Sequence, residues 1–260
     1  MIRYRASFLT YIVGDYEKVQ EVDAKTPDCQ YVLVTDNKEL KSDTWEIKYV
    51  DNPYPEDPFW LCYEIRFNPF KYVDSDVVVR IDGSMKCTGD FTYVLDYFED
   101  GGYDTLLCAH PTRYNMYDER VAWVNQRQFP VKQAEKVLGF INNAEGYDVK
   151  NAKGLFQMNF QILRNNKINN DANFMTLAFL KYLAGDGKQI ERVDQDIYTF
   201  VVQKYFNNMK ILLSSQYIGM TGKYFLWMAH HTDIPMTYNT ANDCQPYLFN
   251  EPVNTVYLGY

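Results

Sequence analysis

The chain has 260 residues, of which 47% are hydrophobic and 17% aromatic, enough to build one sizeable core. Its 26 Lys and Arg residues face 34 Asp and Glu residues, a net charge of −8. This acidic balance argues against a nucleic-acid partner, because phosphates are bound by a basic face. No stretch reaches about 18 consecutive apolar residues, so we expect no membrane-spanning segment, while peripheral contact with a membrane stays open.

The five cysteines stand at Cys29, Cys62, Cys87, Cys108 and Cys244, an odd number without a C-x-x-C motif. We expect reduced, mostly buried thiols rather than a disulfide framework or a zinc site, which is typical of a cytoplasmic protein. The apolar stretch near the N-terminus is too short for a secretory signal and is typical of a strand. We therefore expect a cytoplasmic location, with the inner face of the membrane as the place where peripheral contact would occur.

Short apolar runs alternate with helical patterns along the chain. Runs that end in turn-forming residues predict strands at 7–13, 31–35, 45–50, 77–81, 105–109 and 155–163. Apolar periodicity predicts helices at 59–67, 116–126, 131–141, 172–183 and 196–206. The alternation favours an α/β fold with a mostly parallel sheet flanked by helices. We expect a single domain over residues 1–260, with 207–260 as its C-terminal extension.

Polar residues at the carboxyl ends of strands are the first candidates for a site, because ligands of open α/β sheets bind there. In this sequence they are Gly14, Asp36, Asp82 and His110, although the turns that end strands favour Asp and Gly in any protein. Asp82 follows the most hydrophobic strand, and its carboxylate can hold Mg²⁺ or Mn²⁺ against a diphosphate. Gly83 would let the backbone approach the ligand closely.

A second candidate for the metal lies upstream, where Asp74 and Asp76 form a literal D-x-D. This tripeptide is frequent by chance, and the residues before it make a poor strand, whereas a good strand follows it. We therefore favour Asp82 as the metal ligand. His231, in the pair His230–His231, is a candidate for a further ligand, although a lone histidine is more often structural.

The helical run near residue 196 opens with Asp194 and Gln195. A carboxylate at this place can accept the proton of a substrate hydroxyl, and the neighbouring amide can hold the substrate. An Asp at the start of a helix is also an ordinary N-cap, so the structural and the functional interpretation both stay open.

Six blocks of the sequence resemble, in the same order, the glycosyltransferase-like domain family of the TOD/MUCI type (domain-of-unknown-function family 616) in the GT-A superfamily. They are YIVGDYEKV, YVLVTDN, RFNPFKYVDSDVVVRIDGSMKCTGD, AHPTRYNMYDE, GLFQMNFQILRNN and VDQDIYTFVVQK, and the resemblance covers roughly residues 4–205. In that family an I-D-G motif takes the place of the D-x-D, which favours Asp82. Ser84 stands where the family has Asn, Val193 where it has Arg, and either Asp118 or Glu119 matches its Glu.

The resemblance implies a GT-A fold, with a central mixed, mostly parallel sheet flanked by helices. It also implies a glycosyltransferase that moves a sugar from a nucleotide-sugar donor to a glycan or glycolipid acceptor, with Mn²⁺ or Mg²⁺ as cofactor. The predicted donor site comprises Thr10, Gly14, Asp36, Arg66, Asp82, Gly83, Ser84, His110 and Arg113. The predicted catalytic residues are Asp194 and Gln195, and the predicted metal ligands are Asp82 and His231.

Two alternatives stay open. Val193 removes a charge expected near the sugar or the diphosphate, so a degenerate nucleotide-sugar or glycan-binding module without turnover is the first. A metal-dependent hydrolase is the second, although the sequence has no H-x-H, H-E-x-x-H or G-x-S-x-G motif.

Overall fold

The computed structural model of the protein describes residues 4–110, 113–126, 129–144, 146–152, 154–185, 192–214, 225–228 and 256–257. The strands are β1 (Ala6–Ile12), β2 (Cys29–Thr35), β3 (Glu46–Tyr49), β4 (Val77–Ile81), β5 (Met85–Cys87), β6 (Thr105–Ala109), β7 (Phe156–Arg164), β8 (Ile211–Ser214), β9 (Phe225–Trp227) and β10 (Val256–Tyr257). The helices are α1 (Phe59–Phe67), the 3-10 turn η1 (Pro69–Lys71), α2 (Thr92–Asp100), α3 (Met116–Asn125), α4 (Val131–Asn142), α5 (Lys167–Ala184) and α6 (Asp194–Tyr205).

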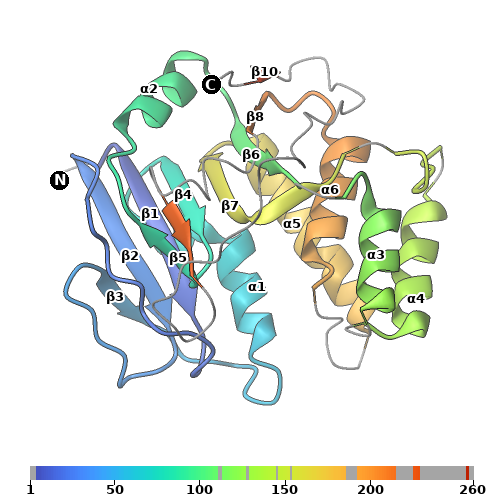
Figure 1. The fold of residues 1–260 in the computed structure, drawn as a ribbon, viewed down its shortest axis with the longest axis horizontal. Helices are drawn as coiled ribbons and strands as arrows, with labels where there is room; N and C mark the ends of the chain where they lie inside the picture. Colours follow the sequence, from blue (N-terminus) through green and yellow to red (C-terminus); the bar gives the residue numbers. More distant parts are fainter. Residues whose placement is uncertain are drawn as a thin grey trace.

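One eight-stranded sheet runs through both halves of the chain, in the order β10-β8-β6-β7-β4-β1-β2-β3 (Figure 1). Of its described strands only β7 runs antiparallel, and it lies between β4 and β6. The remaining neighbours pair in parallel. The predicted α/β class and the mostly parallel mixed sheet are therefore confirmed. A second, two-stranded sheet pairs β5 with β9.

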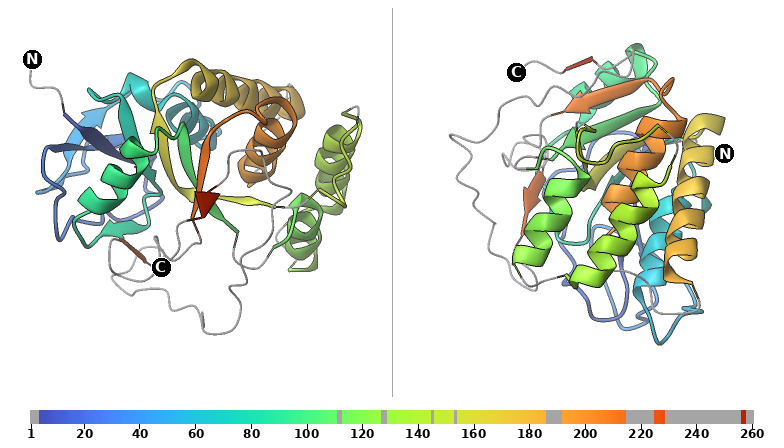
Figure 2. Two further views of the ribbon diagram at one scale, coloured as in Figure 1. Left: turned by 90° about the horizontal axis from the view of Figure 1, so that it is seen from above. Right: turned by 90° about the vertical axis from the view of Figure 1, so that its right-hand side faces the viewer.

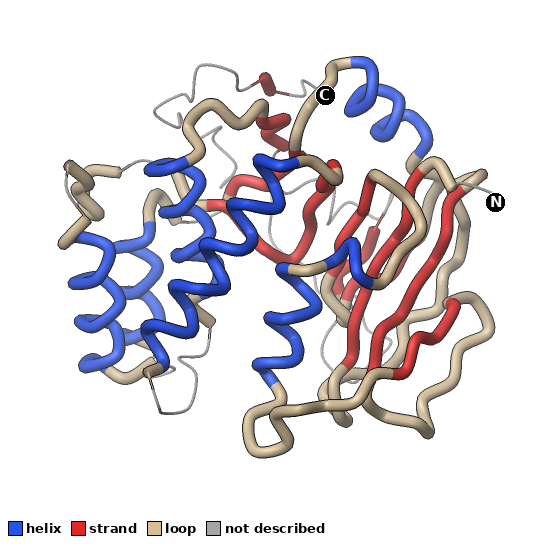
Figure 3. Tube along the Cα trace, turned by 180° about the vertical axis from the view of Figure 1, so that it is seen from behind, coloured by secondary structure: helices blue, strands red, loops and turns tan. Residues whose placement is uncertain are grey.

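Helices cover both faces of the large sheet. Side chains of α1 pack on one face against β1, β2 and β4, and α5 and α6 continue this layer over β6, β7 and β8. Helix α2 covers the opposite face, together with the small sheet. The left panel of Figure 2 places α2 and α5 on opposite sides of the strands, and Figure 3 shows α1 beside α5.

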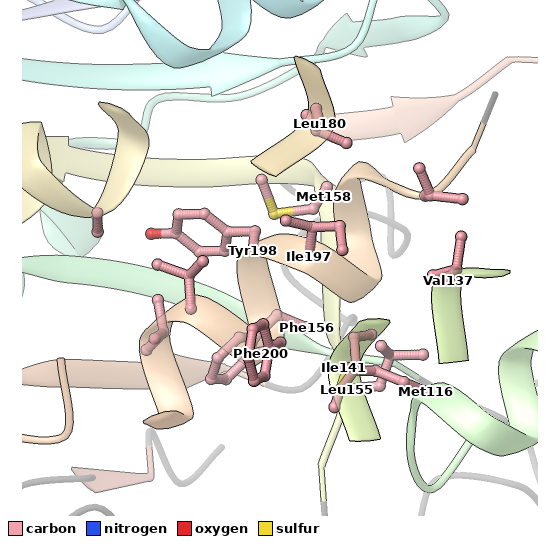
Figure 4. Close-up of a cluster of buried hydrophobic side chains, with 14 of the residues drawn as sticks. Met116, Val137, Ile141, Leu155, Phe156, Met158, Leu180, Ile197, Tyr198 and Phe200 are labelled. Atoms are coloured by element: carbon pink, nitrogen blue, oxygen red, sulfur yellow. The ribbon is translucent and has the colours of Figure 1, made fainter. Parts of the chain in front are cut away.

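The apolar core under α6 is drawn in Figure 4. Phe156 and Met158 from β7 meet Ile197 and Phe200 from α6 in this cluster, and all four side chains are almost fully buried. Burying a large apolar side chain stabilises a fold by roughly 1.5–3 kcal/mol. The cluster therefore fixes α6 against β7 and determines where the first residues of α6 lie.

The sequence located most elements of the fold, and α1, β4 and β6 have the predicted bounds. Helix α5 begins five residues earlier than its apolar periodicity predicts, because Asn166 caps it by accepting a hydrogen bond from the Asn169 N–H. The short strands β5 and β8 were not predicted, since runs this short carry little periodicity, and helix α2 was not predicted either.

The four described cysteines are free thiols, as predicted, and Cys244 lies outside the described residues. Among the described helices none combines the length and the apolar character needed to cross a membrane.

A buried ion pair joins α3 to α6. The Nε atom of Arg120 lies 2.7 Å from a carboxylate oxygen of Asp196, and both residues have no solvent exposure. Arg120 also lies over the ring of Phe129, with its Cζ atom 4.7 Å from the ring centroid. Burial raises the pKa of Asp196 to about 8, although Arg120 acts in the opposite direction. The pair holds the two helices that contribute side chains to the cavity described below.

We predict that Arg120→Met lowers the free energy of unfolding by about 3 kcal/mol at pH 7, because the buried Asp196 carboxyl and the Arg192 carbonyl both lose their polar partner. Without Arg120 the pKa of Asp196 rises further, so the loss should be larger at pH 9 than at pH 7. Urea unfolding of the wild type and the variant at pH 7 and pH 9 measures the two losses of unfolding free energy.

The control is Arg5→Met, which removes a partly exposed ion pair with Asp96 and Glu99 and should lower the free energy of unfolding by about 1 kcal/mol or less. Equal losses in the two variants would contradict the prediction.

Candidate functional site

A cavity of about 340 Å³ opens at the carboxyl ends of β1, β4 and β6, the edge of the sheet where the sequence predicted a site. Its walls come from the ends of these strands, from the start of β7, and from α1, α3 and α6. The lining residues are Tyr11, Tyr16, Phe59, Cys62, Tyr63, Arg66, Asp82, Gly83, Ser84, His110, Glu119, Trp123, Gln157, Met158, Asn159, Arg192, Asp194 and Gln195.

The antiparallel strand β7 closes one wall of the cavity. Because it runs against β4 and β6, its first residues lie beside the last residues of those two strands. The Asp82 N–H donates to the Asn159 carbonyl at 2.9 Å, and the His110 N–H donates to the Leu155 carbonyl at 2.8 Å. This pairing places Gln157, Met158 and Asn159 beside Asp82, a contact that no local sequence pattern indicated.

Asp82 and Gly83 turn sharply after β4 and lie against the end of β1. A Cβ atom added to Gly83 would lie 3.0 Å from the Tyr11 carbonyl oxygen and 3.1 Å from Cγ1 of Ile12. The absent side chain therefore lets the backbone approach β1 as well as the cavity. The Asp82 side chain is 31% exposed and faces the cavity, so its carboxylate is accessible to a ligand.

Arg66 of α1 connects two of the three carboxylates that line the cavity. Its Nη2 donates to Oδ1 of Asp82 at 2.7 Å, its Nη1 donates to Oδ2 of Asp194, and its Nε donates to the Tyr11 hydroxyl at 2.6 Å. Burial alone would lower the pKa of Arg66, but Tyr11 and the two carboxylates outweigh it and raise this pKa. One guanidinium thus joins the carboxyl ends of β4 and β1 to the start of α6.

A second arginine lies beneath Asp82. Arg80 has no solvent exposure, and its Nη1 is 4.0 Å from Oδ1 of Asp82. Its Nη2 donates to Gln161, whose amide in turn donates to the Tyr198 hydroxyl. Within the described part of the chain its Nε and Nη1 have no hydrogen-bond partner. Burial, followed by the neighbouring Arg66, lowers the pKa of Arg80.

Glu119 is the centre of a third group. It is only 5% exposed, and it accepts hydrogen bonds from Nε1 of Trp123 at 2.6 Å and from Nε2 of Gln195 at 3.2 Å. Nε of Arg113 and Nε2 of His110 lie 3.4 Å and 3.9 Å from its Oε2. The group brings together His110, Arg113 and Gln195, which were predicted from two separate parts of the sequence.

The structure also separates the two acidic residues that the resemblance left as alternatives. Glu119 lines the cavity, whereas Asp118 lies in the first turn of α3, where its N–H donates to the Asn115 side chain. Glu119 and Trp123 are four residues apart on one helix and therefore lie on the same face. That spacing is the sequence signal that could have identified Trp123, which was not predicted.

Aromatic rings and a further arginine form the outer part of the cavity. Tyr16 is 48% exposed and packs edge-on against Phe59, with ring centroids 6.0 Å apart. Arg192 and Trp123 also line the cavity, and the guanidinium of Arg192 lies over the Trp123 ring, with its Cζ atom 4.7 Å from the ring centroid. Arg192 and these rings were not among the predicted site residues.

Some predicted site residues lie outside the lining. The Gly14 N–H donates to Oδ1 of Asp36 at 2.6 Å, and Oδ2 of Asp36 accepts from Asn52 at 2.9 Å, so these residues tie the loops after β1 and β2 together. Thr10 is buried in β1 and points to the opposite face from Tyr11, since side chains alternate along a strand. His231 lies outside the described residues.

The D-x-D tripeptide lies at the other end of β4. Asp74 accepts a hydrogen bond from the Gln30 side chain at 3.1 Å, and the Asp76 carbonyl accepts from the Asn165 N–H at 2.7 Å. At roughly 3.3 Å per residue, the strand puts about 20 Å between Asp76 and Asp82. The two candidate motifs therefore cannot act in one site, and only Asp82 faces the cavity.

The described residues leave the predicted Mn²⁺ or Mg²⁺ cofactor a prediction. Among them no group of three or more His, Cys, Asp or Glu side chains is placed to hold a metal ion. One oxygen of Asp82 and one of Asp194 accept hydrogen bonds from Arg66, which takes the position between the two carboxylates. His231, the other predicted ligand, is outside the described part of the chain. No step proposed below is routed through a metal.

No family model matches this chain, and a search of the curated proteins finds no match. The resemblance to the TOD/MUCI-type family therefore stays a prediction that rests on the six sequence blocks.

His110 stays neutral in the fold. Burial, and then the positive charge of Arg113, lower its pKa to about 3 from an ordinary value of 6.5, and the nearby Glu119 does not offset this. Above pH 6.5 the folded and the unfolded chain both hold a neutral His110. Between pH 6.5 and 3 the unfolded chain binds a proton there that the folded chain does not, so the stability of the fold decreases as the pH falls.

We predict that His110→Gln removes about 2 kcal/mol of the stability loss that the wild type shows between pH 7 and pH 5. Urea unfolding of both proteins at the two pH values measures the difference. All other titrating groups are shared by the two proteins and cancel in the comparison. Parallel pH profiles would show that His110 is protonated in the fold and would contradict the assignment of its neutral state.

Proposed function

We propose that this chain is a glycosyltransferase that moves a sugar from a nucleotide-diphosphate sugar to a hydroxyl of a glycan or glycolipid. The observation that carries the proposal is the combination of arginines and aromatic rings around one cavity at the carboxyl ends of parallel strands. Such a cavity suits a ligand that has both a flat ring system and an anionic group.

The charges around the cavity favour an anionic ligand. The three carboxylates of the cavity or its aromatic wall are contacted by five arginines, at positions 66, 80, 113, 120 and 192. Acidic residues outnumber basic ones in the whole chain, 34 to 26. The arginines around the cavity therefore form a local concentration of positive charge in an acidic protein. Guanidinium groups bind phosphate oxygens well, because their planar N–H groups match the spacing of those oxygens.

The aromatic rings supply the other part of the fit. Tyr16, Phe59 and Trp123 line the cavity, and Tyr16 presents much of its ring to solvent. Such rings stack on nucleobases, and they also pack against the apolar faces of sugars. The sheet agrees with this interpretation, since a mostly parallel sheet in which one of the described strands runs antiparallel fits the mixed sheet that a GT-A fold implies.

The transfer needs an acceptor hydroxyl and a group that takes its proton. The hydroxyl oxygen forms a bond to the anomeric carbon of the sugar, and the bond from that carbon to the diphosphate oxygen breaks. The nucleoside diphosphate leaves with the electron pair, and the hydroxyl proton passes to a carboxylate. We assign this role to Asp194, which lines the cavity at the start of α6, with Gln195 held beside it by Glu119.

We predict that one class of nucleotide-sugar raises the melting temperature of the protein. A ligand at 100 times its Kd adds about 2.7 kcal/mol to the free energy of unfolding. The screen uses UDP-, GDP- and ADP-sugars, with a CMP-sugar as the single-phosphate comparison, each with EDTA and with Mn²⁺. Absence of stabilisation by every nucleotide-sugar under both conditions would contradict the proposal.

Asp194→Asn should then keep this stabilisation but slow the release of nucleoside diphosphate by about 10²- to 10⁴-fold, since it removes the proton acceptor. Asp74→Asn is the matched control, because Asp74 lies at the opposite end of β4 and should leave both readouts unchanged. Equal rates in the two variants would remove Asp194 from the mechanism.

A nucleotide-sugar-binding module without turnover is the second candidate, and one observation favours it. Each of the three carboxylates of the cavity already contacts an arginine, Asp82 and Asp194 through Arg66 and Glu119 through Arg113. A carboxylate held in this way is less available as a proton acceptor. Stabilisation by a nucleotide-sugar without any release of nucleoside diphosphate in the presence of acceptor glycans would support this candidate.

A further inference from the structure

We propose that Arg192 binds the diphosphate of the donor, an inference that rests on the proposed function and assigns the residue that holds its leaving group. Arg192 lines the cavity immediately before α6. It differs from Arg66, the other arginine of the cavity lining, in three respects: it has no carboxylate partner among the described residues, its guanidinium lies closer to an aromatic ring, and its backbone is left-handed.

The first difference concerns charge. The guanidinium of Arg66 is held by the carboxylates of Asp82 and Asp194, so its charge is offset within the protein. Arg192 has no carboxylate within ion-pair distance among the described residues, and its side chain is exposed. An exposed cation in the wall of a cavity, without an acidic partner, is available to an anionic ligand.

The second difference concerns orientation. Arg192 stacks on the ring of Trp123, and Nε1 of this tryptophan donates to Glu119 at 2.6 Å, which fixes the ring. A guanidinium that stacks through its face keeps its N–H donors at the edge, where they can bind two oxygens of one phosphate. The position over Trp123 therefore holds the guanidinium of Arg192 at the cavity.

The third difference concerns the backbone. Arg192 has a φ of 57°, a left-handed conformation that side-chain-bearing residues rarely adopt. Its carbonyl accepts a hydrogen bond from Nη2 of the buried Arg120 at 2.8 Å, and Arg120 is itself paired with Asp196. Strain of this kind persists where surrounding contacts enforce it, and it is concentrated at ligand-binding positions. The Arg120–Asp196 pair thus holds the strained turn that presents Arg192.

Together these features place a positive charge where a departing diphosphate needs one. The sequence suggested that such a charge was missing, since Val193 stands where the related family has Arg. Val193 is buried in the apolar core, and the residue before it faces the cavity instead. The positive charge is therefore present, one position earlier in the chain.

The test uses the complete chain and two variants of this residue. Arg192→Asn removes the guanidinium but tolerates the left-handed conformation, so the melting temperature should stay near that of the wild type. Arg192→Lys keeps the charge. The matched control is Arg5→Asn, which removes an arginine remote from the cavity. Titration calorimetry with UDP, GDP and ADP, in EDTA and again in Mn²⁺, gives the Kd. Repeating the titrations at several salt concentrations gives the salt dependence of the Kd.

For the nucleotide that the wild type binds, we expect Arg192→Asn to raise the Kd by about ten- to a hundredfold. The salt dependence should become weaker, because a charged contact is lost. Arg192→Lys should recover part of the affinity, and Arg5→Asn should leave it unchanged.

An unchanged Kd in Arg192→Asn would overturn this inference and leave the proposed function standing. A higher Kd with unchanged salt dependence and no recovery in Arg192→Lys would assign a structural role to Arg192 and also overturn it. If the wild type binds none of the nucleotides in either condition, the inference and the proposed function both fail.

Discussion

The geometry of the site depends on one guanidinium. Arg66 joins Asp82 at the end of β4, Asp194 at the start of α6 and Tyr11 in β1, three elements that are far apart in the sequence. Removing one partner from such a partly buried pair leaves a charge uncompensated, which is strongly destabilising. The bridge therefore sets the distance between α6 and the sheet edge, and with it the width of the cavity.

Two further constraints shape the same cavity. The antiparallel strand β7 enters between β4 and β6, so its first residues form a wall beside the ends of its neighbours. The buried pair of Arg120 and Asp196 fixes α3 against α6, and it also holds the backbone of Arg192. Rigid elements thus position the aromatic and charged side chains, which is how a preorganised binding site is built.

The arrangement of charge links this geometry to function. Asp82, which was predicted to hold a metal, and Asp194, which was predicted to be catalytic, are both bound to Arg66, whereas Arg192 is exposed on an aromatic wall and has no acidic partner among the described residues. A cavity of this kind holds its acidic groups in place and directs positive charge at the ligand. A glycosyltransferase and a binding module without turnover would both use these side chains to hold a nucleotide-sugar. Only a measurement of turnover therefore distinguishes the two proposed functions.

The sequence by itself determined the elements with strong local patterns. It located the strand 77–81 and the helix 59–67, and it favoured Asp82 over the D-x-D because a carboxylate at the carboxyl end of a buried strand reaches the ligand-binding edge. The tertiary structure decided which side chains meet there. Arg66 meets Asp194 only because α1 and α6 pack on one face of the sheet, and Trp123 and Arg192 come together across 69 positions of sequence. Local periodicity records which face of an element is buried, whereas contacts between distant elements depend on the packing of the whole core.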